Sequence, residues 1–502
     1  MFGQESIIKS EIFTKIAIYL GIFFGVEIFS YLALMFPDFN IIIFSVLILI
    51  LLGLSCYRLE YGLLLVLAEL FIGSMGHLFV LPLGNFQLSI RMAFWATILL
   101  VFGIVFIYQL IKDGKQSQYF KILKNFAPGK YFGLLAIFIT IGLVNAYFKD
   151  QAFNLIFSDF NAWLYWLLFF PIVVVYGGEN ESVFKNLKNI FLAATIFLSL
   201  KTLGLLFIFT HNLNCAPDVY FWLRKTLVGE MTSTLSGWPR IFIQGQIFSG
   251  VALFLTFWSG LKQSSSKIYN KNNIGAVLLT ALFFSSILIS FSRSFWVALI
   301  GTVIFCLLMI WRLYSWRKTW IAGTWLVVSF LLGFILIYSV AIFPYPTPGK
   351  FNANFIDRVA GSNEPALASR WSLLPVLAKE IRKEPFFGQG YGATITYLSR
   401  DPRVLEKNPS GEYTTYAFEW GYLDLWLKIG LLGLLAYLIL IIYLIKSAFI
   451  FGHKNNDFFL FGLGSGLIFL VITNFFTPYL NHPLGIGILL IGACLIRKDK
   501  VY

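Results

Sequence analysis

Residues 420–444 read WGYLDLWLKIGLLGLLAYLILIIYL, and nearly all of them are apolar. A helix needs about 20 consecutive, mostly apolar residues to cross the hydrocarbon core of a bilayer. This stretch meets both the length and the composition that a spanning helix requires. It therefore predicts a transmembrane helix. The rest of the chain can be searched for runs of the same kind.

Similar apolar runs recur along the whole chain, from near residue 15 to residue 496. Read in the same way, they predict about fourteen spanning helices. Besides 420–444, the predicted spans are 15–36, 40–56, 61–81, 91–111, 131–148, 158–176, 187–210, 241–261, 274–291, 294–311, 319–343, 457–472 and 483–496.

The composition excludes several classes of protein. Hydrophobic residues make up 58% of the 502 residues and charged residues 12%, whereas a soluble domain carries about 25% charged residues. A soluble enzyme and a disordered chain are therefore excluded. A single anchor on a soluble domain is excluded too, because the apolar runs continue to the end. The predicted fold class is an all-α polytopic membrane protein.

The charge distribution predicts a topology. The net charge is +14, from 38 Lys and Arg against 24 Asp and Glu. With the N-terminus inside, most Lys and Arg outside the longest loop fall in predicted cytoplasmic segments, as the positive-inside rule requires. An even number of spans places both termini in the cytoplasm. The excess of basic residues then reflects topology, and no nucleic-acid partner is expected.

One connection, residues 344–419, is far longer than an ordinary loop and lies on the external (periplasmic) side of the membrane in this topology. It divides the chain into helices 1–11 (1–343), a long external loop (344–419) and helices 12–14 (420–502). Residues 365–385, PALASRWSLLPVLAKEIRKEP, predict an amphipathic helix that Pro375 kinks or divides. Such a helix suits the membrane surface. Its predicted apolar face consists of Leu367, Trp371, Leu374, Ala378 and Ile381.

Four arginines converge on the external face in this topology. Arg91, Arg240 and Arg293 each stand at the external start of a predicted span, and Arg370 lies on the loop helix. Arginine grips phosphate and carboxylate groups bidentately, so the set predicts a site for an anionic group, most simply a diphosphate. The alternative is that each side chain reaches the lipid headgroups. Lys201, inside a predicted span, is expected to pair with Glu27 or Glu69.

Glu419 is the best-placed candidate base, because it directly precedes span 420–444 and has Tyr413, Tyr416 and Trp420 nearby. A partly desolvated carboxylate there would have a pKa raised toward a useful range. The alternative is a helix N-terminal acid that the helix dipole favours, and Asp424 is the second candidate. The sequence lacks a CxxC pair, a metal-binding Cys/His spacing and a Walker A motif. We therefore expect no metal and no cofactor, and the energy for a reaction must arrive in the substrate.

Three patches of the sequence resemble one family. They are FSRSFWVALIG (291–301), SRWSLLPVLAKEIRKEPFFGQGYG (369–392) and GYLDLWLKIGLLGLLAYL (421–438). Two weaker patches agree: AELFIGSMGHLFV (68–80) with QLSIRMAF (87–94), and PRIFIQGQ (239–246). In this order, around a single long loop, they resemble the superfamily of O-antigen ligases and O-antigen polymerases of the bacterial envelope.

The resemblance implies a helical membrane glycosyltransferase with a GT-C-like fold, acting at the external face of the bacterial inner membrane. Its donor would be a glycan on undecaprenyl diphosphate. Arg293 and Arg370 would hold the diphosphate and stabilise it as the leaving group, without a metal and with inversion at the anomeric carbon. Aromatic residues of the loop would suit contact with sugars, with lipid contact as the alternative; they are Trp371, Tyr391, Tyr397, Tyr413 and Tyr416.

The chain departs from the ligase pattern at one position. Ligases of this superfamily usually carry a His about eleven residues before the glycine that is here Gly430, and this chain has Glu419 there. That difference favours a polymerase of lipid-linked repeat units, which would admit a chain-length regulator as partner. Two alternatives stay open: a ligase that moves a finished glycan to lipid A core or to protein, and a flippase of lipid-linked sugars.

Overall fold

The computed structural model describes residues 2–84, 86–178, 181–233, 238–263, 271–344 and 365–497. Helices dominate these residues, as predicted. The long helices and their bounds are α1 (Phe2–Met35), α2 (Pro37–Tyr57), α3 (Leu59–Ile72), α4 (Ile90–Asp113), α6 (Gly129–Phe148), α9 (Glu181–Thr210), α11 (Gln246–Gln263), α12 (Lys271–Ile289), α13 (Arg293–Leu313), α14 (Trp316–Ile342), α16 (Pro365–Lys383), α18 (Gly421–Lys454), α19 (Phe458–Thr473) and α20 (Pro483–Arg497).

Shorter elements connect these helices. The short helices are α5 (Gln118–Lys124), α7 (Phe153–Phe160), α8 (Phe169–Tyr176), α10 (Ala216–Lys225) and α17 (Pro402–Lys407), with 3-10 segments at Gly114–Gln116 and Asn161–Leu168. The described strands form antiparallel pairs, namely β1 (Val80–Leu83) with β2 (Phe86–Ser89), β3 (Gly229–Ser233) with β4 (Pro239–Ile243), and β5 (Ile395–Leu398) with β6 (Glu412–Thr415).

The prediction of a polytopic membrane protein is confirmed. Within the described residues, nine helices are long and apolar enough to cross a membrane, and α12, α19 and α20 contain shorter apolar segments. These twelve match twelve of the predicted spans. Large apolar side chains such as Phe13, Ile42, Ile104 and Ile304 stay more than half exposed on the outward faces of their helices, as a lipid-facing surface requires.

Two predicted spans, 61–81 and 241–261, differ from the structure. The helix that starts the first one, α3, ends at Ile72, because Ser74 and Gly76 take left-handed backbone conformations, which stop a helix. The chain then enters β1. In the second, Ile241 and Ile243 belong to β4 and pair with β3, so α11 starts only at Gln246. An apolar run alone does not distinguish a strand from the first turns of a helix.

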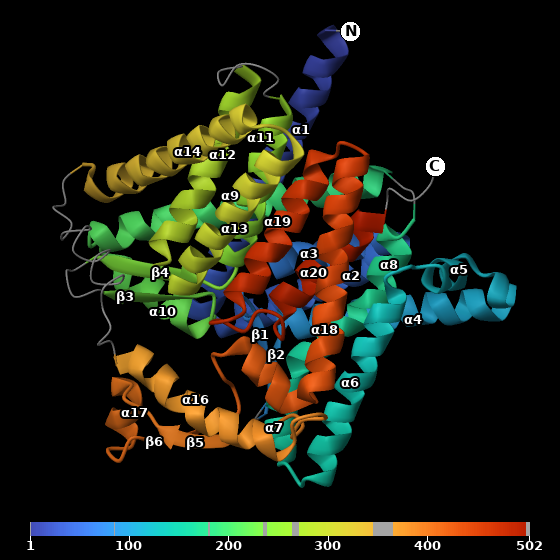
Figure 1. The fold of residues 1–502 in the computed structure, drawn as a ribbon, viewed down its shortest axis with the longest axis vertical. Helices are drawn as coiled ribbons and strands as arrows, with labels where there is room; N and C mark the ends of the chain where they lie inside the picture. The colour runs from blue at the N-terminus through green and yellow to red at the C-terminus, as the bar shows by residue number, and fades with distance from the viewer. Residues whose placement is uncertain are drawn as a thin grey trace.

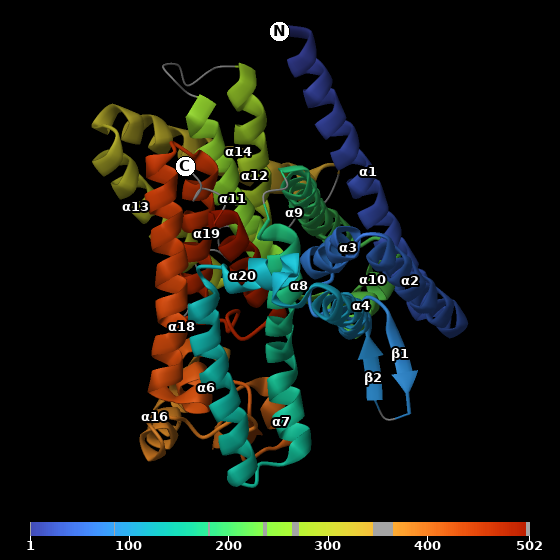
Figure 2. The same cartoon turned by 90° about the vertical axis from the view of Figure 1, so that its right-hand side faces the viewer.

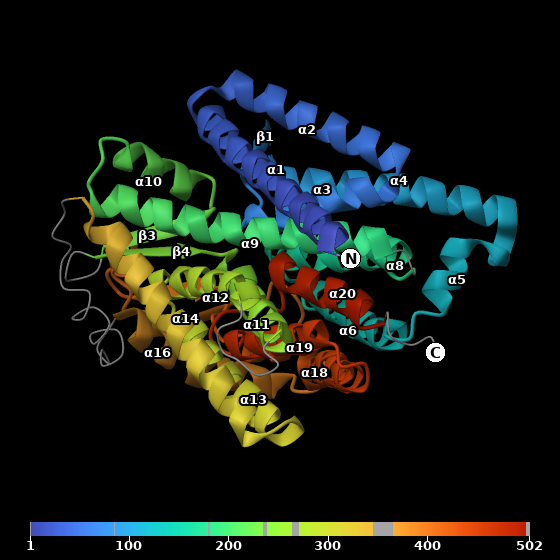
Figure 3. The same ribbon diagram turned by 90° about the horizontal axis from the view of Figure 1, so that it is seen from above.

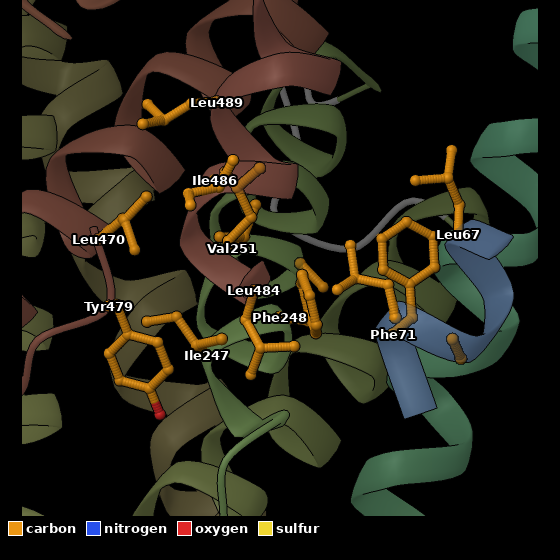
Figure 4. Close-up of a cluster of buried hydrophobic side chains, with 14 of the residues drawn as sticks. Leu67, Phe71, Ile247, Phe248, Val251, Leu470, Tyr479, Leu484, Ile486 and Leu489 are labelled. Atoms are coloured by element: carbon orange, nitrogen blue, oxygen red, sulfur yellow. The ribbon is translucent and has the colours of Figure 1, made fainter. Parts of the chain in front are cut away.

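The helices surround a large apolar core, while the long loop folds at one end of the molecule. Figures 1 and 2 show α16, α17, β5 and β6 together at the end opposite to the start of α1. Seen from above, in Figure 3, α1 to α4 lie on one side of α9, and α11 to α14 with α18 and α19 lie on the other. Figure 4 shows how Phe71 of α3, Phe248 of α11 and Leu484 of α20 meet in the core.

Helix α18 is broken at Gly430, whose backbone (φ 73°, ψ 175°) is not helical. The break frees backbone groups that a helix would have paired, and the turn 385–392 pairs four of them. The N–H groups of Gln389 and Gly390 donate to the carbonyl oxygens of Leu427 and Lys428 at 2.6 and 3.1 Å. In return, Leu431 and Leu432 donate their N–H groups to the carbonyls of Pro385 and Phe386.

The glycines of this turn, PFFGQGYG, are required by close approach as well as by their conformation. Gly388 and Gly390 both have positive φ, and a Cβ on either would lie within 2.5 Å of backbone nitrogen, of Gly430 and of Ala146 respectively. An L-residue at either position would combine backbone strain with a collision. The turn therefore fits between α6 and the break in α18 only with glycine at these two positions.

Residues 365–429, which we call the external unit after the side predicted for the long loop, have a small apolar core of their own. Its buried members are Leu373, Leu377, Ile381, Ala393, Ile395, Phe418 and Leu427. The predicted apolar face of the loop helix was therefore wrong in part. Ile381 is buried, but the buried stripe of α16 continues through Leu377 and Leu373, and Trp371 is 57% exposed. The side chain of Leu367 lies outside the described residues, and Pro375 stands inside a continuous α16.

We predict that Gly430→Ala lowers the free energy of unfolding by at least about 2 kcal/mol, because this backbone region is essentially restricted to glycine and a Cβ would lie 2.1 Å from the carbonyl oxygen of Phe386. Gly53→Ala on α2 is the matched control, since a Cβ there meets nothing within 4 Å. Thermal unfolding in detergent measures both. Equal midpoints for the two variants would show that the break contributes nothing to stability.

Candidate functional site

Three predicted site residues meet at the start of α18. Arg370 of α16 forms an ion pair with the carboxylate of Glu419. The indole N–H of Trp420 donates to the backbone carbonyl of Arg370 at 3.0 Å, and the ring of Trp420 contacts Trp371. Both charged side chains remain accessible, Arg370 at 37% and Glu419 at 53%. The structure thus places a cation and a carboxylate side by side at a surface that solvent or substrate can reach.

Arg293 is linked to this pair through the short segment between α19 and α20. The segment between α19 and α20 places Phe476 against the ring of Trp420, and the hydroxyl of the next residue, Thr477, hydrogen-bonds Ser294 at 2.9 Å. Arg293 precedes Ser294 and is the first residue of α13. A cation in the first turn of a helix opposes the helix dipole, so helix stability does not explain this arginine.

Arg240 of β4 lies beside the same junction. Its guanidinium donates through Nε to the carbonyl of Ser290 at 3.1 Å and lies over the ring of Phe242. Ser290 directly follows α12, three residues before Arg293. The contacts therefore bring Arg240, Arg293, Arg370 and Glu419 to segments that border one another.

Arg91 has a different environment. Its guanidinium binds both carboxylate oxygens of Glu69 at 3.0 Å and the carbonyl of Ser74 at 2.5 Å, and both charged side chains are at least 93% buried. A guanidinium paired in this way has little remaining capacity for a diphosphate. These contacts indicate that Arg91 holds α3, α4 and the loop between α3 and β1 together.

His482, which precedes α20, lies near this arginine. Burial, with a smaller contribution from the positive charge of Arg91, lowers the pKa of His482 to about 3. The imidazole is therefore neutral at physiological pH, and its Nε2 contacts the sulfur of Met75 at 3.1 Å. A base with so low a pKa is a poor proton acceptor. His482 is therefore a poor substitute for the histidine that ligases usually carry at the position of Glu419.

The expectation that Lys201 pairs with Glu27 or Glu69 is confirmed for Glu27. The Lys201 ammonium donates to Glu27 at 2.6 Å, and both side chains are at least 90% buried. The pair joins α9 to α1, while Glu69 is taken by Arg91.

The predicted environments of the acids need correction. Glu419 was expected to be partly desolvated, but its side chain is half exposed and is balanced by Arg370. Asp424, the second candidate base, is 1% exposed and pairs with Lys428 at 2.7 Å. It is therefore enclosed within the protein rather than presented to a substrate.

Lys428 is the important residue that the sequence reasoning missed. Its ammonium lies 2.5 Å from Asp159 of α7 and 2.7 Å from Asp424. The signal was available, because a lysine and an aspartate four residues apart inside a spanning run are a functional hypothesis by default.

The aromatic residues predicted for sugar contact divide into two groups. Trp371 and Tyr413 are exposed, and Tyr413 contacts the half-buried Tyr397 edge-on, while Tyr416 is half-buried. Tyr391 is fully buried between Phe160 and Trp163. Burial, together with the charges of Asp159 and Asp424, raises its pKa well above the ordinary value. Its ring presents no face to a sugar, because the turn 385–392 inserts it into the main core.

Comparison with known proteins assigns the region that holds this site. A family profile described as O-Antigen ligase matches residues 277–438, from α12 to the middle of α18. Arg293, Arg370 and Glu419 lie inside the match, whereas Arg91 and Arg240 lie outside it. Over these residues the chain is similar to O-antigen ligases.

A curated relative is similar over a longer stretch. The ComP-specific O-oligosaccharyltransferase of Acinetobacter baylyi is 26% identical over 380 residues, which are 74% of this chain. The chain spans 60% of the length of that relative. The residues that the family profile matches include the long connection between α14 and α18.

In the part of the chain that the structure describes, no group of three or more His, Cys, Asp and Glu side chains is placed to hold a metal ion. The charged groups that the structure places at the site are the guanidinium of Arg370 and the carboxylate of Glu419. Guanidinium groups bind phosphate oxygens, and a carboxylate accepts a proton. Together they have the chemistry to hold a diphosphate and activate a hydroxyl.

We predict that Arg91→Met lowers membrane levels and the unfolding midpoint, because it leaves the Glu69 carboxylate buried and unpaired, at a cost of about 3–5 kcal/mol. The double variant Glu69→Gln/Arg91→Met removes both charges and is expected to recover most of that loss. Its activity then tests the predicted diphosphate contact. If the double variant is stable but binds no donor, Arg91 contributes to diphosphate binding, as the sequence predicted.

Proposed function

We propose that this chain transfers an oligosaccharide from a polyprenyl-diphosphate carrier to the hydroxyl of an acceptor. The observation that carries the proposal is the pairing of Arg370 with Glu419, one short connection away from Arg293. All three residues lie within the match to the O-antigen ligase profile. The proposed setting is the external face of a bacterial inner membrane, with both termini cytoplasmic and undecaprenyl diphosphate as the carrier.

In the proposed reaction, Arg293 and Arg370 hold the donor diphosphate. The acceptor oxygen attacks the anomeric carbon, and the bond from that carbon to the diphosphate oxygen breaks. The electron pair of this bond leaves with the diphosphate, whose growing charge the two arginines stabilise. Glu419 takes the proton of the acceptor hydroxyl, and direct attack inverts the anomeric configuration.

Ligase-type transfer is the first candidate for the acceptor reaction. Its support is the description of the family profile and the name of the relative, an O-oligosaccharyltransferase. Polymerisation of lipid-linked repeat units is the second candidate. It is favoured by Glu419, which stands where ligases of the superfamily usually carry a histidine, and it would leave room for a chain-length partner.

One assay tests the reaction and separates the two candidates. We expect the purified protein, given a synthetic undecaprenyl-diphosphate repeat unit, to release undecaprenyl diphosphate in the presence of a suitable acceptor, as measured by mass spectrometry. A ladder spaced by one repeat, formed without a further acceptor, identifies a polymerase. Release that depends on added lipid A core or protein identifies a ligase. Arg293→Ala and Arg370→Ala are each expected to abolish either product at normal membrane levels, and normal products from both variants would exclude the proposed diphosphate site.

The ion pair adds a second expectation. Glu419 and the donor diphosphate compete for the same guanidinium, so donor binding would release the carboxylate to act as a base. Glu419→Gln is therefore expected to bind inorganic diphosphate up to about fivefold more tightly, as the loss of an exposed ion pair allows, while transfer falls about 10²- to 10⁴-fold.

Isothermal titration and the transfer assay measure these two effects. Glu412→Gln, which removes the same charge from the exposed strand β6, is the matched control and is expected to leave both unchanged. Full transfer activity in Glu419→Gln would exclude Glu419 as the base.

A further inference from the structure

Three charged side chains are buried together beneath the candidate site. Lys428 lies between Asp159 and Asp424, at 2.5 and 2.7 Å, and none of the three side chains is more than 6% exposed. Burying charges costs several kcal/mol per ion, and a buried cluster is often no more stabilising than apolar residues of the same size. Stability is therefore a weak explanation for this cluster, and its connections suggest another.

The cluster joins four segments that are distant in sequence. Asp159 belongs to α7, and its second oxygen accepts the N–H of Gly392 at 2.8 Å. Asp424 accepts a hydrogen bond from the side chain of Asn481, in the connection between α19 and α20, at 2.5 Å. The carbonyl of Lys428 accepts the N–H of Gly390. Helix α7, the turn 385–392, the first part of α18 and the connection 474–482 are thus held at one point.

Each part of the candidate site depends on one of these segments. Glu419 and Trp420 stand at the start of the part of α18 that precedes the break. Arg370 lies on α16, which packs on that part through the core of the external unit. Gln389 also holds α16, since its amide donates to the carbonyl of Glu380 at 2.7 Å.

Arg293 is reached from the other side of the cluster. The connection that Asn481 anchors contains Thr477, whose hydroxyl contacts Ser294 beside Arg293. One connection from Arg293 on the helical bundle to Arg370 in the external unit therefore runs through the cluster, beside the direct contact of Phe476 with Trp420.

We propose that Asp159, Lys428 and Asp424 form an electrostatic clamp that sets the position of the external unit, with Arg370 and Glu419, relative to Arg293 on the bundle. They are positioning residues and touch no substrate. The expected effect of the clamp on catalysis rests on the proposed function, because two arginines that bind one diphosphate must keep a fixed separation. Its structural consequence is independent of what the protein does.

Asp159→Asn is the sharpest test, because it removes only the link between α7 and α18. Lys428 keeps Asp424, so no buried charge is left unpaired, and the oxygen of an asparagine still accepts the N–H of Gly392. The matched control is Glu27→Gln/Lys201→Met, which removes a buried ion pair between α1 and α9. Figure 2 shows α1 well away from α16.

We expect Asp159→Asn to lower kcat at least tenfold, since a displacement of about 1 Å is enough to cost more than that. Its unfolding midpoint should fall no further than that of the control, and the control should keep the wild-type kcat. A kcat that falls only in proportion to a loss of folded protein would reduce Asp159 to a structural role and overturn the proposal.

A distance measurement tests the clamp without an activity assay. Spin labels at Glu406 on α17 and Ile304 on α13, both exposed, are placed in a background without the exposed cysteines Cys56 and Cys215. Double electron–electron resonance is expected to give a shifted or broadened distance distribution in Asp159→Asn and an unchanged one in the control. An unchanged distribution in Asp159→Asn would overturn the clamp. If the wild-type protein transfers no glycan, the proposed function fails, and this distance measurement still decides on the clamp.

Discussion

The break in α18 at Gly430 is the constraint on which the end of the molecule that holds α16, α17, β5 and β6 (Figure 1) depends. A helix within a membrane protein must pair its backbone groups internally, and a break is tolerated only where another part of the protein supplies partners. Here the turn 385–392 supplies them, so one segment of the long loop is built into a membrane helix. This explains why the loop folds against the bundle instead of trailing from it, and why PFFGQGYG is rich in glycine.

Helix α18 contributes to both apolar cores. Before Gly430, Leu427 lies in the core of the external unit while Leu425 and Ile429 lie in the main core, and after Gly430 the helix contributes Tyr437 and Leu440 to the main core. One helix thus joins the external unit to the helical bundle, and the buried charges of Asp159, Lys428 and Asp424 lie where the two meet. An apolar contact there would permit sliding, because dispersion and hydrophobic contacts have little directional preference. Short charge-assisted hydrogen bonds fix a distance and a direction.

Much of this architecture was predictable, because hydrophobic length is a strong signal in membrane proteins. The spans at Pro37–Tyr57 and Trp316–Ile342 needed only a count of apolar residues. The signal failed where backbone conformation decided the outcome, as at Ser74 and Gly76 after α3, and where strands continued an apolar run, as at Ile241. Within the site, the sequence pointed to Arg370 and Glu419 as candidates, but it did not predict that they pair. Pairing depends on how α16 lies against α18, and the helical periodicity of residues 365–385 pointed to a different face.

The arginines show why residue type alone does not assign a role. Arg91 and Arg370 are both paired with a glutamate, and both were predicted to bind the same anion. Arg91 and Glu69 are nearly inaccessible, so exchanging the carboxylate for a phosphate would require burying the new anion and exposing the old one. Arg370 and Glu419 are 37% and 53% exposed, so water already solvates both partners and the exchange costs little. Accessibility of the partner carboxylate, rather than the presence of an ion pair, therefore separates an arginine that holds the fold from one that can receive a substrate.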